Sequence, residues 1–338
     1  MRKVNGRLAL LLFCISLMLL ACKPNYSATK AANQIETTLS SDGKLLAVLL
    51  DRREESPTLL IKWLGRDEPW LKVPAPKYTS SIRFGLSGYG LLLTHAQPGP
   101  PGASQLSRWD ASRPDQPSEI LYQGSQVKSP VEVSPGQYLV TACKYVPSDD
   151  RCTGRAFIGV LWTLIRNGEA LPMDETSPRS FHYQPNVTEG GFYWVTGAEF
   201  AYPKSIEPQV HAFALPGGSV PEPDRRRFDQ SSHSMACDYK TQRCLMTYLT
   251  DERTDQTTFV WGIRVFDGAS RCDMPEVKGY MDEVTVTPDG RAAVIPLARS
   301  KSEPRHVVVL RFKPGQCEPT NIQRLYFEPT DAEGQRGR

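Results

Sequence analysis

The chain has 338 residues, 40% of them hydrophobic, and its 40 Lys and Arg residues against 37 Asp and Glu residues give a formal net charge of +3. Residues 1–21 hold three bases and no acids, so a chain cleaved after residue 21 carries 37 charges of each sign. A neutral protein has no excess of positive charge with which to hold nucleic acid, and nucleic acid is therefore excluded as an expected partner.

The first 22 residues have the layout of a secretory signal. Arg2, Lys3 and Arg7 form a basic head, and the apolar run Leu8–Leu20 is shorter than the ~20 residues of a membrane span. The run ends in Leu19-Leu20-Ala21-Cys22, which resembles the bacterial lipobox, in which the cysteine is acylated and becomes the mature N-terminus. The alternative is a plain signal peptide that is cut near Ala21.

The lipobox resemblance implies that residues 1–21 are removed and that Cys22 anchors the protein to a lipid bilayer through its acyl chains. Lys23 follows the cysteine, whereas aspartate at this position would favour retention in the inner membrane by resemblance to enterobacterial sorting. We therefore expect an envelope protein on the periplasmic face of the outer membrane. Residues 22–33 are polar and rich in small residues, which predicts a lipidated, flexible tether.

A repeat of about fifty residues organises the chain from residue 34 to residue 329. Six turns recur at steps of 45, 48, 54, 51 and 49 residues, and their markers are Gly43, Gly88, Gly136, Gly190, Thr241 and Gly290. Each turn precedes an apolar strand, and these strands are expected at residues 45–50, 90–94, 138–142, 192–196, 244–249 and 292–297. Asp-Gly and related pairs supply the positive φ that a tight hairpin needs.

Aromatic residues keep phase with these turns. Each turn is followed 20 to 26 residues later by an aromatic residue that ends a strand, namely Trp63, Trp109, Trp162, Phe213, Phe266 and Phe312. A fourth short strand fits after each of them, as at residues 119–122 and 322–327. Four strands per unit, six times over, predict an all-β fold, a six-bladed β-propeller with four antiparallel strands per blade. We expect the aromatic residues to pack between neighbouring blades.

Two of the repeats resemble a known family. Ser41-Asp42-Gly43-Lys44-Leu45-Leu46-Ala47 and Thr287-Pro288-Asp289-Gly290-Arg291-Ala292-Ala293 are similar to the S-P-D-G-K-x-hydrophobic-A repeat of TolB-type six-bladed propellers. Ser134-Pro135-Gly136 is a shortened copy. The resemblance implies the propeller architecture for residues 34–329. We expect residues 330–338 to form a disordered tail. It does not imply the role of TolB, which has an N-terminal α/β domain for which this chain has no room and is not lipid-anchored.

Six cysteines remain when Cys14 of the signal and Cys22 of the anchor are set aside, and an even number in an oxidising compartment favours disulfides. The expected pairs are Cys143 with Cys152, Cys237 with Cys244 and, by elimination, Cys272 with Cys317. The first two close short loops, and the third would join the fifth and sixth blades. A zinc site is the alternative, but the chain has no C-x-x-C motif.

Motifs of catalysis are sparse in the chain. The five histidines form no metal-binding pair, and neither a G-x-S-x-G elbow nor a glycine-rich phosphate loop occurs. We therefore predict no catalytic residue, metal ion or cofactor, and no enzymatic activity. The alternative is a propeller hydrolase or lactonase whose site is assembled from dispersed residues around the central channel.

Long loops rich in Pro, Gly and aromatic residues are the candidate contact surface, at residues 97–105, 145–155 and 200–208. Within the second loop we predict that Tyr145, Asp149, Asp150 and Arg151 contact a protein partner. The alternative is that these loops are merely variable and exposed to solvent. The predicted function is an envelope lipoprotein that binds a periplasmic or envelope protein as a scaffold or assembly factor. An immunity or inhibitor lipoprotein, which neutralises a toxic enzyme, is the second interpretation.

Overall fold

A computed structural model of the chain describes residues 35–50, 57–97, 103–125, 127–144, 159–176, 185–196, 209–223, 235–253, 259–279, 283–297 and 305–327. The chain divides into two compact units, residues 1–34 and residues 35–338, and every described residue belongs to the second. The predicted signal peptide, the tether and the tail at residues 330–338 lie outside the described residues. Within those ranges no helix has the length and hydropathy that a membrane span requires.

Six antiparallel sheets follow one another along the chain, and each is built from strands that are consecutive in sequence. The first sheet contains β1 (Glu36–Leu39), β2 (Leu45–Leu50), β3 (Thr58–Trp63) and β4 (Leu71–Pro74). The second contains β5 (Thr79–Phe84), β6 (Gly90–Ala96), β7 (Ala103–Asp110) and β8 (Glu119–Ser125). The third contains β9 (Lys128–Ser134), β10 (Gln137–Lys144), β11 (Gly159–Arg166) and β12 (Glu169–Thr176).

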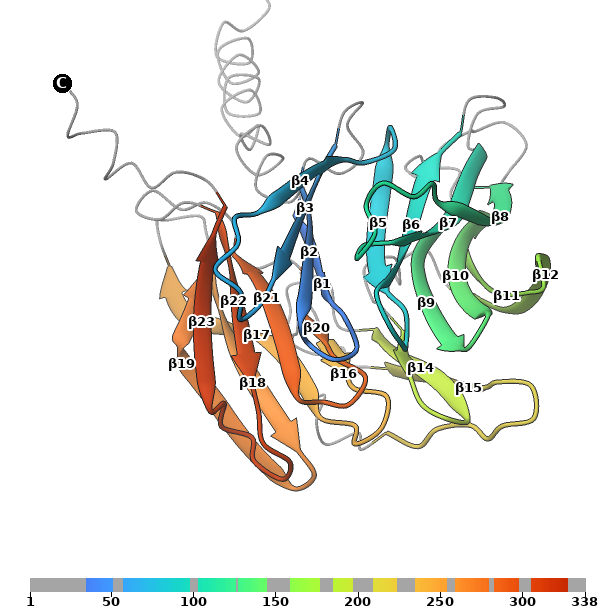
Figure 1. Cartoon of the computed structure of the whole chain (residues 1–338). Helices are drawn as coiled ribbons and strands as arrows, with labels where there is room; N and C mark the ends of the chain where they lie inside the picture. The colour runs from blue at the N-terminus through green and yellow to red at the C-terminus, as the bar shows by residue number, and fades with distance from the viewer. Residues whose placement is uncertain are drawn as a thin grey trace, which may run out of the picture. The chain divides into compact units, whose positions relative to one another are not determined.

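The second half of the chain repeats this pattern (Figure 1). The fourth sheet contains β13 (Asn186–Val187), β14 (Gly191–Thr196) and β15 (Gln209–Ala214) within the described residues. The fifth contains β16 (Met235–Cys237), β17 (Cys244–Arg253), β18 (Phe259–Asp267) and β19 (Ser270–Gly279). The sixth contains β20 (Thr285–Val286), β21 (Ala292–Leu297), β22 (His306–Arg311) and β23 (Asn321–Tyr326).

The six sheets form a closed ring, because a hydrophobic cluster joins every neighbouring pair. Clusters join the first sheet to the second around Leu45 and Trp109, the second to the third around Leu106 and Tyr138, and the third to the fourth around Trp162 and Trp194. The remaining clusters join the fourth to the fifth around Tyr193, the fifth to the sixth around Ile263 and Leu310, and the sixth to the first around Val307 and Leu46. The predicted all-β, six-bladed propeller with four antiparallel strands per blade is confirmed.

The aromatic markers all lie on or just after the third strand of their blades. Four of them, Trp109, Trp162, Phe266 and Phe312, are buried in the clusters between blades, while Trp63 and Phe213 pack against such clusters from partly buried positions. The prediction that they pack between blades is therefore confirmed. Trp162 also lies 5.2 Å from Trp194 of the next blade, measured between ring centroids.

The turn after β1 shows why its residues are Ser, Asp and Gly. Ser40 Oγ accepts a hydrogen bond from the backbone N–H of Leu45 (2.9 Å) and donates one to Asp42 Oδ1 (2.7 Å). The same Asp42 oxygen accepts from the N–H of Lys44 (3.0 Å), and Gly43 has a φ of 66°. The side chains thus satisfy the turn's N–H groups, and glycine takes the left-handed position without a steric penalty.

The turn after β16 has no glycine, so other residues satisfy its N–H groups and take the left-handed conformation. Asp238 accepts hydrogen bonds from the N–H groups of Lys240 (2.8 Å) and Arg243 (2.6 Å) and from Thr241 Oγ1 (2.7 Å). Gln242 takes the left-handed conformation, with a φ of 56°. Among residues other than glycine, Asn, Asp and His adopt the left-handed region most often. Glutamine is unusual there, so the surrounding structure fixes the conformation of Gln242.

Two of the three predicted disulfides lie in the described part of the chain. Cys237 and Cys244 are directly opposite each other on β16 and β17, with a Cα–Cα distance of 4.0 Å. Cys272 of β19 bonds to Cys317, which follows β22, and joins the fifth blade to the sixth. Cys152 and the side chain of Cys143 lie outside the described residues.

Within the described residues the sixth and first blades share no strand, since β1 and β23 belong to different sheets. Thr285 Oγ1 donates to the carbonyl of Thr37 (3.3 Å), and the Arg311 guanidinium donates to the carbonyl of Gly43 (2.8 Å). At the outer edge Trp70 Nε1 donates to the carbonyl of Tyr326 (3.0 Å). Side chains thus make the closure that a shared strand would otherwise provide.

Candidate functional site

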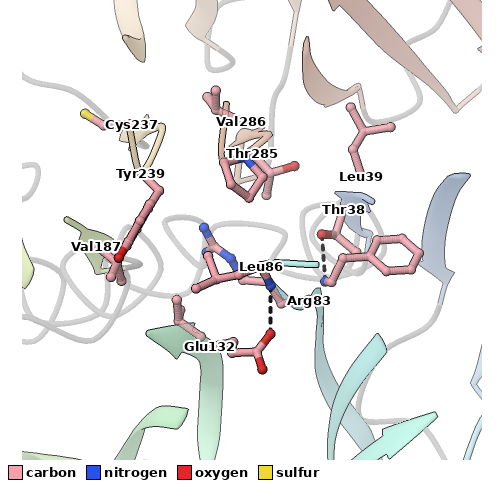
Figure 2. A pocket seen from close by; sticks show the side chains of 13 residues that line it. Thr38, Leu39, Arg83, Leu86, Glu132, Val187, Cys237, Tyr239, Thr285 and Val286 are labelled. Carbon is pink, nitrogen blue, oxygen red and sulfur yellow. Dashed lines mark hydrogen bonds between the residues drawn. The ribbon is translucent and has the colours of Figure 1, made fainter. Parts of the chain in front are cut away.

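The inner strands of all six blades enclose a small cavity on the ring's axis (Figure 2). It lies at the face that carries the turns between the first and second strands of the blades, which we call the turn face, because Leu86, Tyr239 and Pro288 of these turns line it. The other lining residues are Thr38, Leu39, Arg83, Phe84, Val131, Glu132, Val187, Cys237, Thr285 and Val286.

The cavity has a volume of about 40 Å³. One water needs roughly 10–15 Å³ measured in this way, so the cavity has space for about three waters. Pockets for organic ligands of drug size measure about 300–1,000 Å³. The cavity can therefore receive the end of a side chain, a chain terminus or a small ion, but not a sugar ring or a nucleotide.

Among the described residues that line the cavity, Arg83 and Glu132 are charged. Arg83 extends from β5 into the enclosed space, and Glu132 lies on the neighbouring β9 (Figure 2). Burial lowers the pKa of Arg83, while the charges of Glu283 and Glu36 act in the opposite direction. A guanidinium stays protonated in a protein, so the result is a permanent positive charge in a poorly solvated position.

The carboxylate of Glu132 is already engaged by backbone groups. Its Oε2 accepts from the N–H of Leu86 (2.8 Å) in the preceding blade, and its Oε1 accepts from the N–H of Gly136 (3.3 Å). Glu132 thus connects the second and third blades and caps the turn that follows its own strand.

The same kind of contact links other neighbouring inner strands. Glu36 Oε1 accepts from the N–H of Ile82 (3.0 Å), and Thr38 Oγ1 accepts from the N–H of Phe84 (3.1 Å). An inner strand has one edge without a strand partner, and its N–H groups would otherwise be buried without a hydrogen bond. The side chains of one blade satisfy the backbone of the next.

This pattern continues around the ring. Asn186 Oδ1 of the fourth blade accepts from the N–H of Cys237 in the fifth (2.8 Å), and Ser81 Oγ of the second accepts from the N–H of Ser129 in the third (3.1 Å). These polar residues are buried, and their positions around the axis are explained by the bonds between blades.

Partly exposed apolar side chains surround the mouth of the cavity, and we call Leu86, Tyr239, Val286 and Pro288 the collar. The N–H of Tyr239 donates to the carbonyl of Pro288 (3.2 Å), which joins the fifth and sixth blades at the collar. Burial raises the pKa of the Tyr239 phenol, and the charge of Glu189 adds to the effect. Tyr239 is therefore a neutral side chain at physiological pH.

Two arginines, the buried Arg243 and the partly buried Arg311, hold the turns of the turn face in place. Arg243 donates to the carbonyl of Gly290 in the next blade, pairs with Asp267 (2.6 Å) and lies over the ring of Phe312 (4.9 Å). Arg311 makes the equivalent bond to Gly43, across the seam between the last and first blades. The turns are thus fixed to each other as well as to their own strands.

An aromatic pair lies on the turn face between the first and second blades. Trp63 and Tyr89 meet edge to face with a centroid distance of 5.0 Å, and the Arg66 guanidinium lies 4.3 Å from the Trp63 ring. Tyr89 donates its hydroxyl proton to Asp42 Oδ2 (2.9 Å). Burial raises the pKa of Asp42, but the hydrogen bonds from Ser40, Lys44 and Tyr89 outweigh this and lower it overall.

Several predicted site residues lie outside the described residues: Cys22, Tyr145, Asp149, Asp150 and Arg151. Their predicted roles in lipidation and partner binding stay predictions. Of the residues that the structure describes, no three His, Cys, Asp or Glu side chains are grouped in a way that could hold a metal ion.

Comparison with known proteins shows which fold the chain has, but not its activity or its partners. No protein-family model matches the chain, and no curated protein sequence matches it significantly. Solved structures do match. TolB from Acinetobacter baumannii has a TM-score of 0.54 at 12% sequence identity, with 80% of this chain and 61% of TolB covered.

Two proteins of Pyrococcus are similar in the same way. The β-propeller domain of the Trilobed protease from Pyrococcus furiosus, described as having an open velcro topology, matches with a TM-score of 0.50 and 12% identity over 88% of this chain and 86% of that domain. The acylaminoacyl peptidase of Pyrococcus horikoshii matches with a TM-score of 0.53 and 8% identity, over 90% of this chain and 53% of the peptidase. The chain thus spans 61% of TolB and about half of the peptidase.

The chain is similar to these solved structures in its fold alone. The six-bladed propeller with TolB-like structural neighbours agrees with the resemblance drawn from the repeats. Identities of 8–12% support no transfer of activity, partner or site residues.

Apart from Cys237, which was predicted as a disulfide cysteine, and Pro288 of a repeat motif, the residues around the axis were not predicted from the sequence. A signal was nevertheless present, because a polar or charged residue stands four or five positions before most turn markers: Thr38, Arg83, Glu132, Asn186 and Thr285. Inner strands of two to seven residues are too short to show an alternation of polar and apolar residues, so this register is visible only once the turns are aligned.

Proposed function

We propose that the protein is an envelope lipoprotein, tethered through an acylated Cys22, whose propeller binds a protein partner as a scaffold or assembly factor. The observation that carries this proposal is the use of the axial polar side chains. Glu36, Glu132 and Asn186 accept backbone N–H groups of neighbouring blades, so they stiffen the ring. A carboxylate committed to such bonds is poorly placed to take a proton from a substrate.

The turn face supports the same proposal. Arg243 and Arg311 bond to turn carbonyls of the following blades and hold the turns at fixed positions. A surface that is already ordered loses little conformational entropy when a partner binds, and more of the contact energy then appears as affinity. Trp63, Tyr89 and Arg66 on this face are of the residue types that dominate binding energy in protein interfaces.

An immunity lipoprotein would use the same surface on a different partner, a toxic enzyme. A hydrolase or lactonase would need a substrate site, and the axial cavity of about 40 Å³ is too small for a glycan. We therefore propose that the propeller binds a protein and does not catalyse hydrolysis.

Affinity capture tests the proposal. The bait is the mature, oxidised protein from residue 22 with the Cys22→Ser substitution, and the prey is an envelope extract. We expect one protein to be recovered at a fixed stoichiometry. Failure to recover any partner, together with turnover of a lactone or a glycan, would contradict the proposal. If the captured protein kills cells that lack this chain, the immunity role replaces the scaffold role.

The anchor is tested separately by mass. The protein extracted from membranes should exceed the polypeptide mass of residues 22–338 by the mass of its acyl groups. The Cys22→Ala variant should lose that excess and leave the membrane fraction. An unmodified mature protein would contradict the lipid tether and would leave the binding role of the propeller untouched.

A further inference from the structure

The two faces of the ring differ in the strand ends that they carry. The turns between first and second strands lie on the turn face, so each first strand begins at the opposite face, which we call the entry face. The strands of a blade are antiparallel, so a fourth strand also ends at the entry face. β1 therefore begins there, at Glu36, and β23 ends there, at Tyr326 (Figure 1). The chain that leads into β1 joins the ring at the entry face.

The length of chain between Cys22 and the ring limits how the ring can lie on a bilayer. Cys22 and Ile35 are 13 positions apart. A chain of that length spans at most ~45 Å when it is fully extended, and ~20 Å on average as the flexible coil that its composition predicts. The anchor therefore keeps Ile35 close to the membrane.

The two orientations of the ring require different lengths of tether. β1 is an inner strand, so a tether that placed the turn face on the bilayer would first run from the axis to the rim, past three strand spacings or ~15 Å. It would then run along a strand such as β2, whose six residues measure ~20 Å. This path of ~35 Å needs an almost fully extended chain, whereas a chain of average length suffices when the entry face is next to the bilayer.

The turn between β4 and β5 presents a tyrosine on the entry face. The backbone N–H of Thr79 (3.2 Å) and its Oγ1 (2.6 Å) both donate to the carbonyl of Pro76 and close the turn. Tyr78 has a φ of 57° and is 46% exposed. Glycine or asparagine takes this conformation at a lower steric cost, so the turn itself does not need a tyrosine. A strained, exposed residue of this kind points to a use outside the fold.

The chemistry of this turn suits a lipid headgroup region. Tyrosine is enriched at membrane interfaces, where its ring lies against apolar groups and its hydroxyl against water. The exposed Lys77 precedes it, and a lysine near a membrane surface is attracted to anionic lipids. The anchor holds the turn at an effective concentration of about millimolar or more relative to the lipid, so a contact too weak to recruit a free protein holds the tethered one.

We propose that Lys77 and Tyr78 of the β4–β5 turn contact the headgroups of the bilayer in which Cys22 is anchored. The entry face then lies against the membrane, and the turn face points away from it. This inference rests on the proposed acyl anchor, and it adds a second surface of contact and an orientation to it. The turn face is the surface that remains open to a protein partner.

Fluorescence quenching in vesicles tests the orientation. The acylated protein carries Tyr78→Trp, or Arg291→Trp at an exposed position of the turn face. Each variant is reconstituted into vesicles of phosphatidylethanolamine and phosphatidylglycerol, with or without bromine on the acyl chains. We expect bromine to remove the emission that Tyr78→Trp adds to that of the original protein. The emission that Arg291→Trp adds should be unchanged.

Glycine at position 78 tests the contact itself. Tyr78→Gly removes the ring and fits the φ of 57°, so the variant should fold at least as stably as the original protein. The reporter is Pro74→Trp, at the exposed end of β4 on the same face. We expect Tyr78→Gly to reduce the quenching of this reporter by brominated lipid. Ile120→Ser, at a position of β8 that is 55% exposed, is the matched control and should leave the quenching unchanged.

Quenching at position 291, or at neither position, would overturn the inference. A blue-shifted emission from position 78 that bromine does not quench would also overturn it, because protein would then cover the turn. Unchanged quenching of the reporter in Tyr78→Gly would overturn the role of Tyr78. If the purified protein carries no acyl group, the anchor and this inference fall together, whereas a lack of quenching in the acylated protein overturns the inference alone. None of these results bears on the capture experiment.

Discussion

Asp273 on β19 forms an ion pair with Arg264 on the neighbouring strand β18. Arg264, which is buried on β18, donates from Nε to Asp273 Oδ1 (2.6 Å) and from Nη2 to Oδ2 (3.2 Å). This guanidinium lowers the pKa of Asp273 below its ordinary value of 3.8, although burial acts against the change. The carboxylate therefore stabilises the fold at pH values above the unfolded pKa, and the contribution is lost as the pH falls through the folded pKa.

The Asp273→Asn variant should unfold more readily than the original protein at neutral pH, by no more than ~1 kcal/mol, because the Asp273 side chain is 43% exposed and screened by water. The difference should disappear as the pH falls from about 5 to about 2, and urea unfolding at a series of pH values measures it. In an Arg264→Gln background the same substitution should have no such pH dependence. Parallel profiles in both backgrounds would contradict the assignment.

Alanine substitutions at two glycines distinguish the cost of backbone strain from the cost of a steric contact. Gly290 and Gly315 have φ values of 68° and 70°, so an alanine at either position costs about 1 kcal/mol in backbone conformation. At Gly290 the new Cβ would also lie 2.6 Å from Asp238 Oδ2, whereas nothing lies within 4 Å at Gly315.

We therefore expect Gly290→Ala to lower the free energy of unfolding by ~1–3 kcal/mol more than Gly315→Ala does. Chemical denaturation of the two variants gives the difference directly. Equal losses would mean that the fifth and sixth turns are not packed together as described.

At the scale of strands and turns, the two disulfides close loops of very different length. The loop between Cys237 and Cys244 spans 7 residues, and the one between Cys272 and Cys317 spans 45. In the chain-entropy model these lengths correspond to about 2.4 and about 4 kcal/mol of stabilisation.

Replacing Cys272 and Cys317 with alanine should therefore lower the free energy of unfolding by roughly 1.5 kcal/mol more than replacing Cys237 and Cys244. Urea unfolding under non-reducing conditions compares the two double variants. The opposite order would show that the link between the fifth and sixth blades does not constrain the unfolded chain.

The second strands and their turns were predictable because their signals are local. Residues 45–50 and 292–297 match β2 and β21 in both bounds, since an Asp-Gly turn precedes an uninterrupted apolar run at each place. The capping role of Ser40 was missed, because the motif was placed one residue later, at Ser41. The missing glycine of the fifth turn was noticed, but not that Asp238 and Gln242 replace it.

The candidate site was not predictable to the same degree. Glu36 bonds to Ile82, and Asn186 to Cys237, across 46 and 51 residues of sequence, so neither partner is apparent from local patterns. Arg83 shows no special spacing until the blades are superimposed. The residues predicted to contact a partner, such as Tyr145, lie outside the described residues.

For the molecule as a whole, the seam between the first and last blades is held by side chains. Trp70 donates to the carbonyl of Tyr326 and meets the ring of Phe327 edge to face, with centroids 6.0 Å apart. We expect Trp70→Phe to cost about 1 kcal/mol through the lost hydrogen bond, and Trp70→Ala roughly 2–3 kcal/mol.

Hydrogen exchange locates this effect. Amides of β23 and β4 should exchange faster in Trp70→Ala, while those of β8, on the second blade, should not change. The neighbouring Leu71→Ala, at a position that is 45% exposed, is the matched control and should alter neither. Uniform acceleration across all blades would mean that the seam does not open separately.

We propose that the rigid propeller binds its protein partner on the turn face, where the collar lies. Photo-crosslinking in the native host tests it most directly, with a benzophenone amino acid in place of Tyr239 at the collar or of Leu171 at the outer edge of the third blade. We expect a discrete adduct with one other protein from position 239 and none from position 171. No adduct from position 239 in the folded protein, or the same adducts from both positions, would contradict the account.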